Sequence, residues 1–175
     1  MLVLRTAQKE DLSGLRPSDH PDFYRLPAPE GRSRESTIRL DPEGRFFHDG
    51  ELVAHRGMAR AFASWIARHP DDGRFILTNG YDWTYFTVEG APFFIEGVRA
   101  SADGPVLVLF DGSEEPLDAA KLRLDADGIF STTVKGGAFD ARFLRNAQLE
   151  LAPWLEQEPD GAVSLVVQGE RKRVS

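Results

Sequence analysis

The sequence contains no cysteine. That absence excludes disulfides, thiolate nucleophiles and zinc sites with sulfur ligands, fits a reducing compartment, and leaves histidine and carboxylates as the residues that could bind a metal ion. Long apolar runs are also missing. The start, Met1 to Arg5, has too short an apolar stretch for a signal peptide, and no segment approaches the ~20 apolar residues of a membrane-spanning helix. We therefore expect a cytoplasmic protein with no membrane segment.

Basic residues are fewer than acidic ones. The 175-residue sequence has 21 Lys and Arg and 28 Asp and Glu, which gives a net charge of −7. Such a chain repels polyanions at long range, so non-specific binding to nucleic acid or anionic lipid is disfavoured. A local arginine pocket could still bind a small anion. The hydrophobic fraction of 41% is that of a globular protein, so a packed core is expected.

Residues 1–36 hold prolines at positions 17, 21, 27 and 29 among Asp, Arg and Ser. This composition predicts an irregular, Pro-rich N-terminal arm. Its scattered apolar side chains are expected to anchor it on the body, so the arm should be partly ordered. They are Leu12, Phe23, Tyr24 and Leu26.

Residues 37–98 change to short apolar runs separated by turns, which predicts an N-terminal α+β domain. Asp41-Pro42-Glu43-Gly44 and Asp49-Gly50 are hairpin-turn sequences. A helix is predicted from Arg56, with Met58, Phe62, Trp65 and Ile66 on one face, and is expected to end at Pro70-Asp71-Asp72-Gly73. Because no β-α-β alternation appears, the sheet should be largely antiparallel. Further strands are predicted over 74–78, 83–88, 93–98 and 106–110.

A second α+β domain, predicted over residues 99–175, repeats the pattern of the first. Five residues recur 84 positions later (123 − 39 = 84) and two recur 89 positions later (154 − 65 = 89), the offset that a five-residue insertion produces. We interpret this as a duplication, although Asp-x-x-Gly turns also recur by chance. The second helix, over about 140–157, should kink or break near 149–152 because Pro153 removes a hydrogen bond. The recurring residues are Arg39, Leu40, Asp41, Gly44 and Phe46, matched by Arg123, Leu124, Asp125, Gly128 and Phe130, and Trp65 and Pro70, matched by Trp154 and Pro159.

Several segments between about residues 38 and 156 resemble a bacterial family known as domain of unknown function 1285. The most specific is Val88-Glu89-Gly90-Ala91-Pro92-Phe93, although the family usually has an acidic residue where Gly90 stands. The resemblance implies two structurally duplicated domains, a second domain similar to pleckstrin-homology-type folds, and a ligand site at the domain interface. The family has no established activity, and a role in signal transduction is implied. The other matching segments are Leu40 to Gly50, Ala59-Arg60-Ala61-Phe62, Leu77-Thr78 and Ala141-Arg142-Phe143-Leu144-Arg145.

Catalytic signatures are weak. His48 and His55 flank the Asp49-Gly50 turn with Glu51 between them, so a metal site can be drawn, but the same residues are more typical of surface histidines on a hairpin. Ser131-Thr132-Thr133 lacks the Gly-x-Ser-x-Gly context of a nucleophile, and Lys135-Gly136-Gly137 lacks the order of a phosphate-binding loop. We expect no cofactor.

A candidate ligand site is built from the predicted junction of the two domains. Arg142 and Arg145 lie one helical turn apart near a predicted helix start, where their partner is either a carboxylate such as Glu89 or a ligand anion. Pro92 and Phe93 connect the repeats and should belong to the interface core, with an edge that lines a cleft. Trp83, with Tyr81 and Tyr85, is either an exposed stacking surface or core.

The sequence therefore favours a non-enzymatic ligand-binding or regulatory module with a small anionic or nucleotide-like ligand. One alternative is a metal-dependent or hydrolytic enzyme that uses His48, His55 and nearby carboxylates. Another is a protein-interaction domain whose exposed sheet edges recruit a partner strand.

Overall fold

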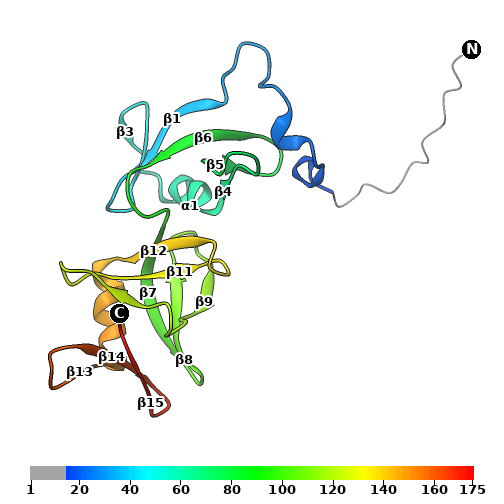
Figure 1. Ribbon diagram of the computed structural model, residues 1–175. Helices are drawn as coiled ribbons and strands as arrows, with labels where there is room; N and C mark the ends of the chain where they lie inside the picture. Colours follow the sequence, from blue (N-terminus) through cyan, green and yellow to red (C-terminus); the bar gives the residue numbers. More distant parts are fainter. Residues whose placement is uncertain (1–14) are drawn as a thin grey trace, which may run out of the picture.

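The computed structural model describes residues 15–175 and shows two halves, each built on a six-stranded sheet (Figure 1). Each half also has one main α-helix, and the second half carries a further three-stranded sheet. This confirms the α+β class. Leu12, one of the expected arm anchors, lies outside the described residues.

The first half orders its strands β3-β2-β1-β6-β5-β4. Neighbouring strands are antiparallel except β1 and β6, which pair in parallel and bring the first and last strands of the half together. The sheet is therefore mixed, although antiparallel pairs dominate as expected. The elements are β1 (Glu35–Leu40), β2 (Phe46–His48), β3 (Glu51–Leu52), α1 (Arg56–Ser64), β4 (Ile66–Arg68), β5 (Phe75–Thr78) and β6 (Trp83–Val88).

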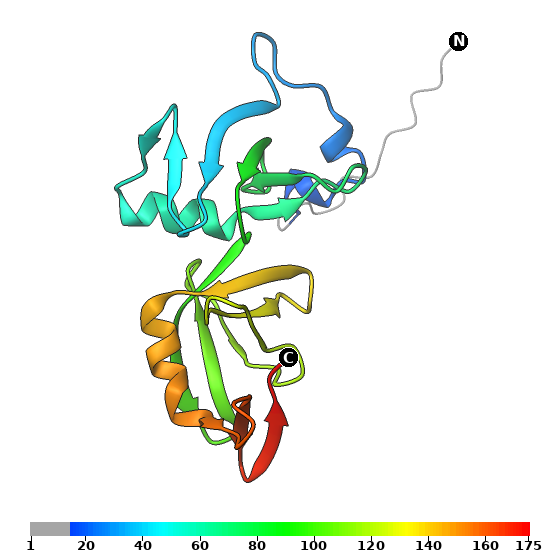
Figure 2. The same ribbon diagram turned by 60° about the vertical axis from the view of Figure 1, so that its left-hand side comes forward.

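The second half orders its larger sheet β10-β11-β12-β7-β8-β9, with β12 and β7 parallel, and its smaller sheet β13-β14-β15. Helix α2 (Arg145–Leu151) lies along this half (Figure 2). The strands are β7 (Phe93–Ser101), β8 (Gly104–Leu109), β9 (Glu114–Pro116), β10 (Arg123–Leu124), β11 (Phe130–Val134), β12 (Phe139–Phe143), β13 (Leu155–Gln157), β14 (Val163–Val167) and β15 (Glu170–Arg173).

The two halves share an order of elements that fits a duplication. In both, three strands lead to a helix, which is followed by a hairpin and a last strand. The first turns match in detail: Asp41 Oδ1 accepts the backbone N–H groups of Glu43 and Arg45, and Asp125 Oδ1 accepts those of Asp127 and Ile129. Strands β7 to β9 are an addition, and β7 pairs with β12, whose counterpart β3 is an edge strand.

Both predicted helices are longer than the helices that form. Helix α1 ends at Ser64, because the Trp65 N–H closes the last turn on Ala61 and Phe62. Ile66 instead opens β4 and pairs with Leu77, so its side chain reaches the core from a strand. Pro70 to Gly73 therefore form the β4–β5 turn and do not end the helix.

The second predicted helix begins too early for a related reason. Residues 139–143 form strand β12, in which Ala141 and Phe143 are buried and alternate with more exposed residues at a period of two. Helix α2 starts only at Arg145 and gives way to a 3₁₀ turn, η3 (Ala152–Trp154), that contains Pro153. The predicted break at this proline is confirmed.

The N-terminal arm lies on the face of the first sheet opposite α1. It contains two short 3₁₀ turns, η1 (Pro17–Asp19) and η2 (Phe23–Arg25). Phe23 is buried and Tyr24 packs against the Trp83 ring, but Leu26 is 55% exposed and is not an anchor.

The chain passes from the first sheet to the second at residues 89–92. This passage precedes the predicted boundary between residues 98 and 99, which falls inside β7, a strand that pairs wholly within the second sheet. The division into separate domains stays a prediction, because one apolar core runs through both halves. Within residues 15–175, no helix is long and apolar enough to cross a membrane.

The junction of the halves is aromatic. Phe46 of the first half stacks on Phe110 of the second with ring centroids 6.0 Å apart, and Phe94 is completely buried. Gly44 makes the close approach that this packing needs: with φ of +83°, a β-carbon there would lie 3.0 Å from the Phe94 ring. A side chain at position 44 would therefore strain the turn and push the halves apart.

The glycine pair near Lys135 belongs to a structural turn. Lys135 Nζ donates to Asp111 Oδ2 at 2.7 Å and to Ser113 Oγ at 2.6 Å, so its charge is already paired within the fold. The Asp111 side chain is only 7% exposed. Burial raises the pKa of Asp111, but hydrogen bonds from Lys135 and Ser113 outweigh this and hold the pKa below its usual value.

We expect Lys135→Met to lower the free energy of unfolding by about 2 kcal/mol at pH 7, less than for a fully buried pair because Lys135 is 31% exposed. Since the paired Asp111 has a lowered pKa, its contribution is complete above the unfolded-state pKa of about 3.9 and is lost as the pH falls through the folded-state pKa. The difference between the two proteins in free energy of unfolding should therefore stay nearly constant from pH 7 to about pH 4 and shrink at lower pH, as urea titrations can show. A pH-independent difference would contradict this, and Lys121→Met is the exposed control.

Thr132 offers a second stability test, because its side chain is 1% exposed and its Oγ1 has no hydrogen-bond partner among the described residues. Thr132→Val keeps the branched shape and removes the unsatisfied hydroxyl, so it should raise the free energy of unfolding by about 1 kcal/mol in urea denaturation. Thr132→Ser, which keeps the hydroxyl and loses the methyl group, should be destabilising. A destabilised valine variant would show that the hydroxyl is bonded in solution.

Candidate functional site

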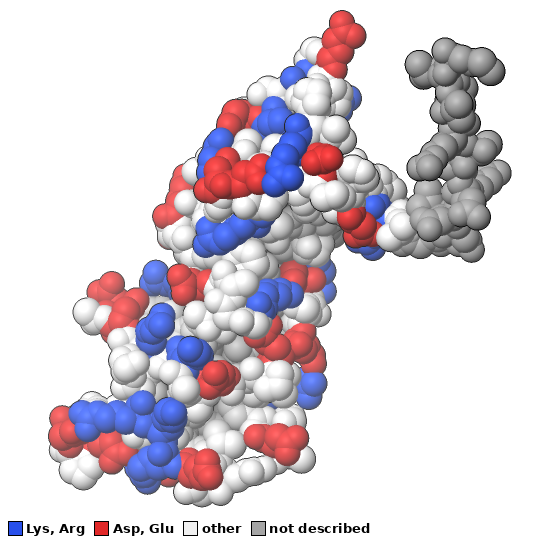
Figure 3. Space-filling view, turned by 45° about the vertical axis from the view of Figure 1, so that its right-hand side comes forward, with Lys and Arg blue, Asp and Glu red and all other residues white. Residues whose placement is uncertain are grey.

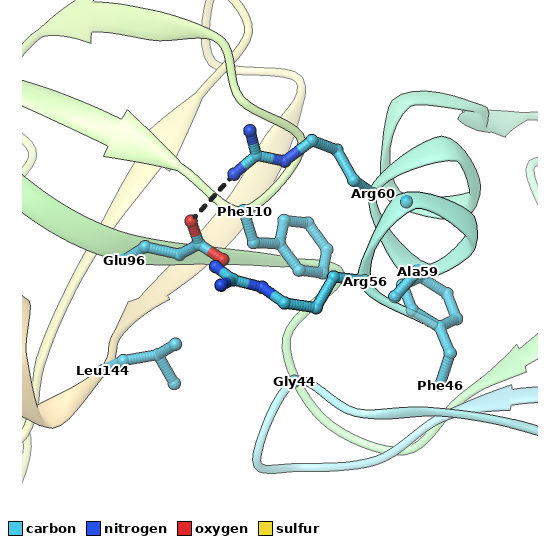
Figure 4. A pocket seen from close by; sticks show the side chains of 9 residues that line it. Gly44, Phe46, Arg56, Ala59, Arg60, Glu96, Phe110 and Leu144 are labelled. Atoms are coloured by element: carbon cyan, nitrogen blue, oxygen red, sulfur yellow. Dashed lines mark hydrogen bonds and ion pairs between the residues drawn. The ribbon is translucent and has the colours of Figure 1, made fainter. Parts of the chain in front are cut away.

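A groove lies between the halves where α1 faces the second half (Figure 4). Its first part is a cavity of ≈ 480 Å³ with Phe46, Phe110 and Leu144 as apolar lining and Arg56, Arg60 and Glu96 as charged lining. An adjoining cavity of ≈ 470 Å³ shares Arg56, Glu96 and Leu144 and adds Arg145 and Asn146. The two cavities therefore form one groove whose lining combines apolar side chains with three arginines and one carboxylate.

Helix α1 supplies two of the arginines. The helix begins at Arg56 because the preceding His55 caps it, accepting the Met58 N–H on Nδ1 at 3.2 Å. Arg56 and Arg60 are four residues apart and so lie on one face of the helix. Figure 4 shows both side chains extending towards β7.

Strand β7 supplies the carboxylate at a break in its register. Ile95 pairs with Leu109 and Gly97 pairs with Val108, so Glu96 is the extra residue of a β-bulge. Bulges of this kind redirect a side chain and are frequent beside functional sites. Gly97 leaves room for α2, because a β-carbon at that position would lie 2.9 Å from the Glu150 carboxylate and would make that side chain shift.

The charges of the groove do not balance. Arg60 Nη2 lies 3.4 Å from Glu96 Oε2, and the two side chains are 52% and 37% exposed. Within residues 15–175, neither Arg56 nor Arg145 has a carboxylate within ion-pair distance. Three guanidinium groups thus share one carboxylate in a protein whose net charge is −7. On the face shown in Figure 3, by contrast, basic and acidic residues are interspersed over both halves.

Of the residues predicted for the site, Arg145 lines the groove. Arg142 does not share a helix with it, because residue 142 belongs to strand β12 and its guanidinium lies 4.0 Å from the Asp125 carboxylate. Glu89 is also apart from both arginines: its carboxylate accepts from Arg39 at 3.3 Å.

The aromatic candidates are mainly core. Pro92 and Phe93 are buried in the passage between the halves, as expected of interface residues. Trp83 is 6% exposed and packs with Phe23 and Ile76 beneath the arm, so it presents no stacking surface at the groove. The arm that covers it could not be placed from local sequence patterns.

Neither histidine of the alternative hypothesis belongs to a cluster of metal-binding side chains. His48 Nε2 lies 3.6 Å from Asp49 Oδ2, and His55 caps α1. In the described part of the chain, no group of three or more His, Asp or Glu residues could hold a metal ion.

Sequence reasoning missed Arg56, Arg60 and Glu96. The first two carried a usable signal, since arginines four residues apart at a predicted helix start share a face. The Glu96-Gly97 step carried a weaker one, because glycine inside a strand often marks a bulge. Their convergence depends on the packing of the halves, which local patterns do not reveal.

The comparisons with known proteins give structural matches alone: no family model and no curated protein matches the sequence. The chain is similar to the crystal structure of a DUF1285 family protein from Silicibacter pomeroyi DSS-3, with a TM-score of 0.62 and 20% identity over 86% of this chain and 91% of that one. It is also similar to a DUF1285 family protein from Shewanella baltica OS155, with a TM-score of 0.51 and 18% identity over 65% of this chain and 87% of that one. The resemblance noted in the sequence is thus confirmed at the level of the fold, and the chain has a DUF1285-like fold.

Proposed function

We propose that the protein is a non-enzymatic module that binds a small anionic ligand in the groove between its halves. The observation that carries this proposal is the excess of positive charge there: Arg56, Arg60 and Arg145 line the groove with Glu96 as the one carboxylate of its lining in the described part of the chain. Guanidinium groups recognise carboxylates and phosphates through paired hydrogen bonds.

The lining of the groove supports a ligand that has both an apolar and an anionic part. Phe46, Phe110 and Leu144 offer apolar contact, and the three arginines offer charged hydrogen-bond donors. The ≈ 480 Å³ cavity falls within the range of roughly 300–1,000 Å³ common for small-molecule sites. A nucleotide-like molecule, with a planar base and an anionic phosphate, meets these requirements.

The same lining argues against catalysis. Among the described residues around the two cavities there is one carboxylate and no serine, threonine or histidine, so no nucleophile with an adjacent base can be assembled there. The hydrolytic or metal-dependent alternative would have to use His48 and His55, which lie outside this lining.

The position of the groove supports a regulatory role. A ligand that touches α1 and α2 at once contacts both halves, so its binding would change how firmly they are joined. We place this role in the cytoplasm and in signal transduction as part of the proposal. Recruitment of a protein partner remains the alternative if no small ligand binds.

The proposal predicts that inorganic pyrophosphate or a nucleoside diphosphate raises the melting temperature, because a ligand that binds the native state at 100 times its Kd stabilises it by about 2.7 kcal/mol. For a chain of this length that corresponds to roughly 5–10 °C. The double variant Arg56→Ala/Arg145→Ala should lose most of this shift in thermal-shift assays.

The matched control is Arg123→Ala/Lys172→Ala, which removes the same charge from β10 and β15, outside the groove. It should keep the shift. An absent shift in the unaltered protein, or equal shifts in both double variants, would refute binding in the groove.

A further inference from the structure

We infer that Glu96 makes the groove selective for ligands that carry an amino or ammonium group in addition to an anionic group. The inference rests on the proposed function and adds to it the chemical class of the ligand. It starts from an anomaly: a site for anions has no electrostatic use for a carboxylate, yet Glu96 lies among three arginines.

The backbone places this carboxylate in the groove. Glu96 is the extra residue of the β7 bulge, and α2 fixes the strand two residues further on, where Glu150 Oε2 accepts the Val98 N–H at 2.7 Å. In a regular strand the residues after 95 would face the opposite way, because side chains alternate. The bulge and the Glu150 contact thus hold Glu96 in position between α1 and α2.

The Glu96 carboxylate is incompletely used by the protein. Its contact with Arg60 is 3.4 Å long, whereas charge-assisted hydrogen bonds are typically about 2.7–2.9 Å. Elsewhere in the same half, the Arg171–Glu158 pair closes to 2.8 Å. A carboxylate has about four acceptor positions, so Glu96 retains capacity for a donor from outside the protein.

These charges fit one class of molecule. A plain polyanion would be attracted by Arg56 and Arg145 but repelled by Glu96. A ligand that has an ammonium or amino group as well as its anionic group can donate a hydrogen bond from that group to the charged acceptor. Two sources share this chemistry: nucleotides whose base bears an amino group, and amino-acid-like zwitterions.

A structural role for Glu96 is the competing explanation. Arg60 bridges the halves, and its guanidinium also packs against Gly112, where a β-carbon would lie 3.2 Å from Nη1. Glu96 could merely tie Arg60 in this place. In that case the carboxylate would affect all ligands alike and would not distinguish those with an amino group.

Matched ligand pairs separate the two explanations in isothermal titration calorimetry. Guanosine monophosphate differs from inosine monophosphate by one amino group, and aspartate differs from succinate by one ammonium group. In at least one pair, the unaltered protein should bind the amino member about tenfold more tightly. Glu96→Gln should lower that ratio severalfold, because the amide oxygen that replaces the carboxylate is a neutral and weaker acceptor, and the ratio cancels any general change in anion affinity.

For pyrophosphate, Glu96→Gln should change the affinity in the opposite direction. Because it has no N–H donor, Glu96→Gln removes only repulsion and should tighten its binding severalfold. Glu170→Gln, an exposed residue of β15, is the control and should change neither value. The melting temperature of each ligand-free variant should stay within about 4 °C of the unaltered protein, as for other exposed ion pairs.

The inference is overturned if none of the four paired ligands binds, if both pairs bind without discrimination, or if Glu96→Gln leaves the ratio unchanged. The pair that discriminates identifies the source of the ligand. If pyrophosphate still stabilises the protein through Arg56 and Arg145, the proposed function stands while the selectivity of Glu96 falls. If pyrophosphate does not stabilise the protein and no paired ligand is discriminated, the proposed function and the selectivity of Glu96 are both refuted.

Discussion

The aromatic packing between the halves is the constraint on which the rest of the structure depends. Phe46, Phe94 and Phe110 meet at the junction, and Gly44 allows the first turn to approach the Phe94 ring. Burying a phenylalanine side chain contributes about 1.5–3 kcal/mol, so a few such contacts hold the halves in one arrangement. The groove lies at the margin of this packing, because Phe46 and Phe110 belong both to the aromatic junction and to the lining of the groove. The core therefore sets the distance between the arginines of α1 and the bulge of β7.

Duplication explains the similar halves, and the inserted strands explain the site. Each half repeats the Asp turn, the three strands and the helix, but only the second half has a strand like β7 beside its third strand. That strand begins at the junction, carries Phe93 and Phe94 into the shared core and presents Glu96 to α1. The candidate site is thus asymmetric between the halves because one of its strands belongs to the segment that the first half lacks.

Local chemistry predicted much of the fold and little of the site. The Asp41 and Asp125 turns, the bounds of β6 and the break at Pro153 follow from turn preferences, alternation and the missing proline N–H. The helix ends were wrong because Ile66 and Phe143 reach the core from strands. Of the groove residues only Arg145 was predicted, since the positions of Arg56, Arg60 and Glu96 depend on a bulge and on contacts between distant segments.

Native-state hydrogen exchange tests most directly whether the shared core makes the halves one cooperative unit. We predict that the most protected amides of β1 and β6 and those of β7 and β12 open with the same free energy and the same dependence on denaturant, because separating the halves exposes the aromatic core. Phe110→Ala should lower the opening free energies of both sets of amides by the same amount. Exchange of one half through an opening that leaves the other protected would contradict the account.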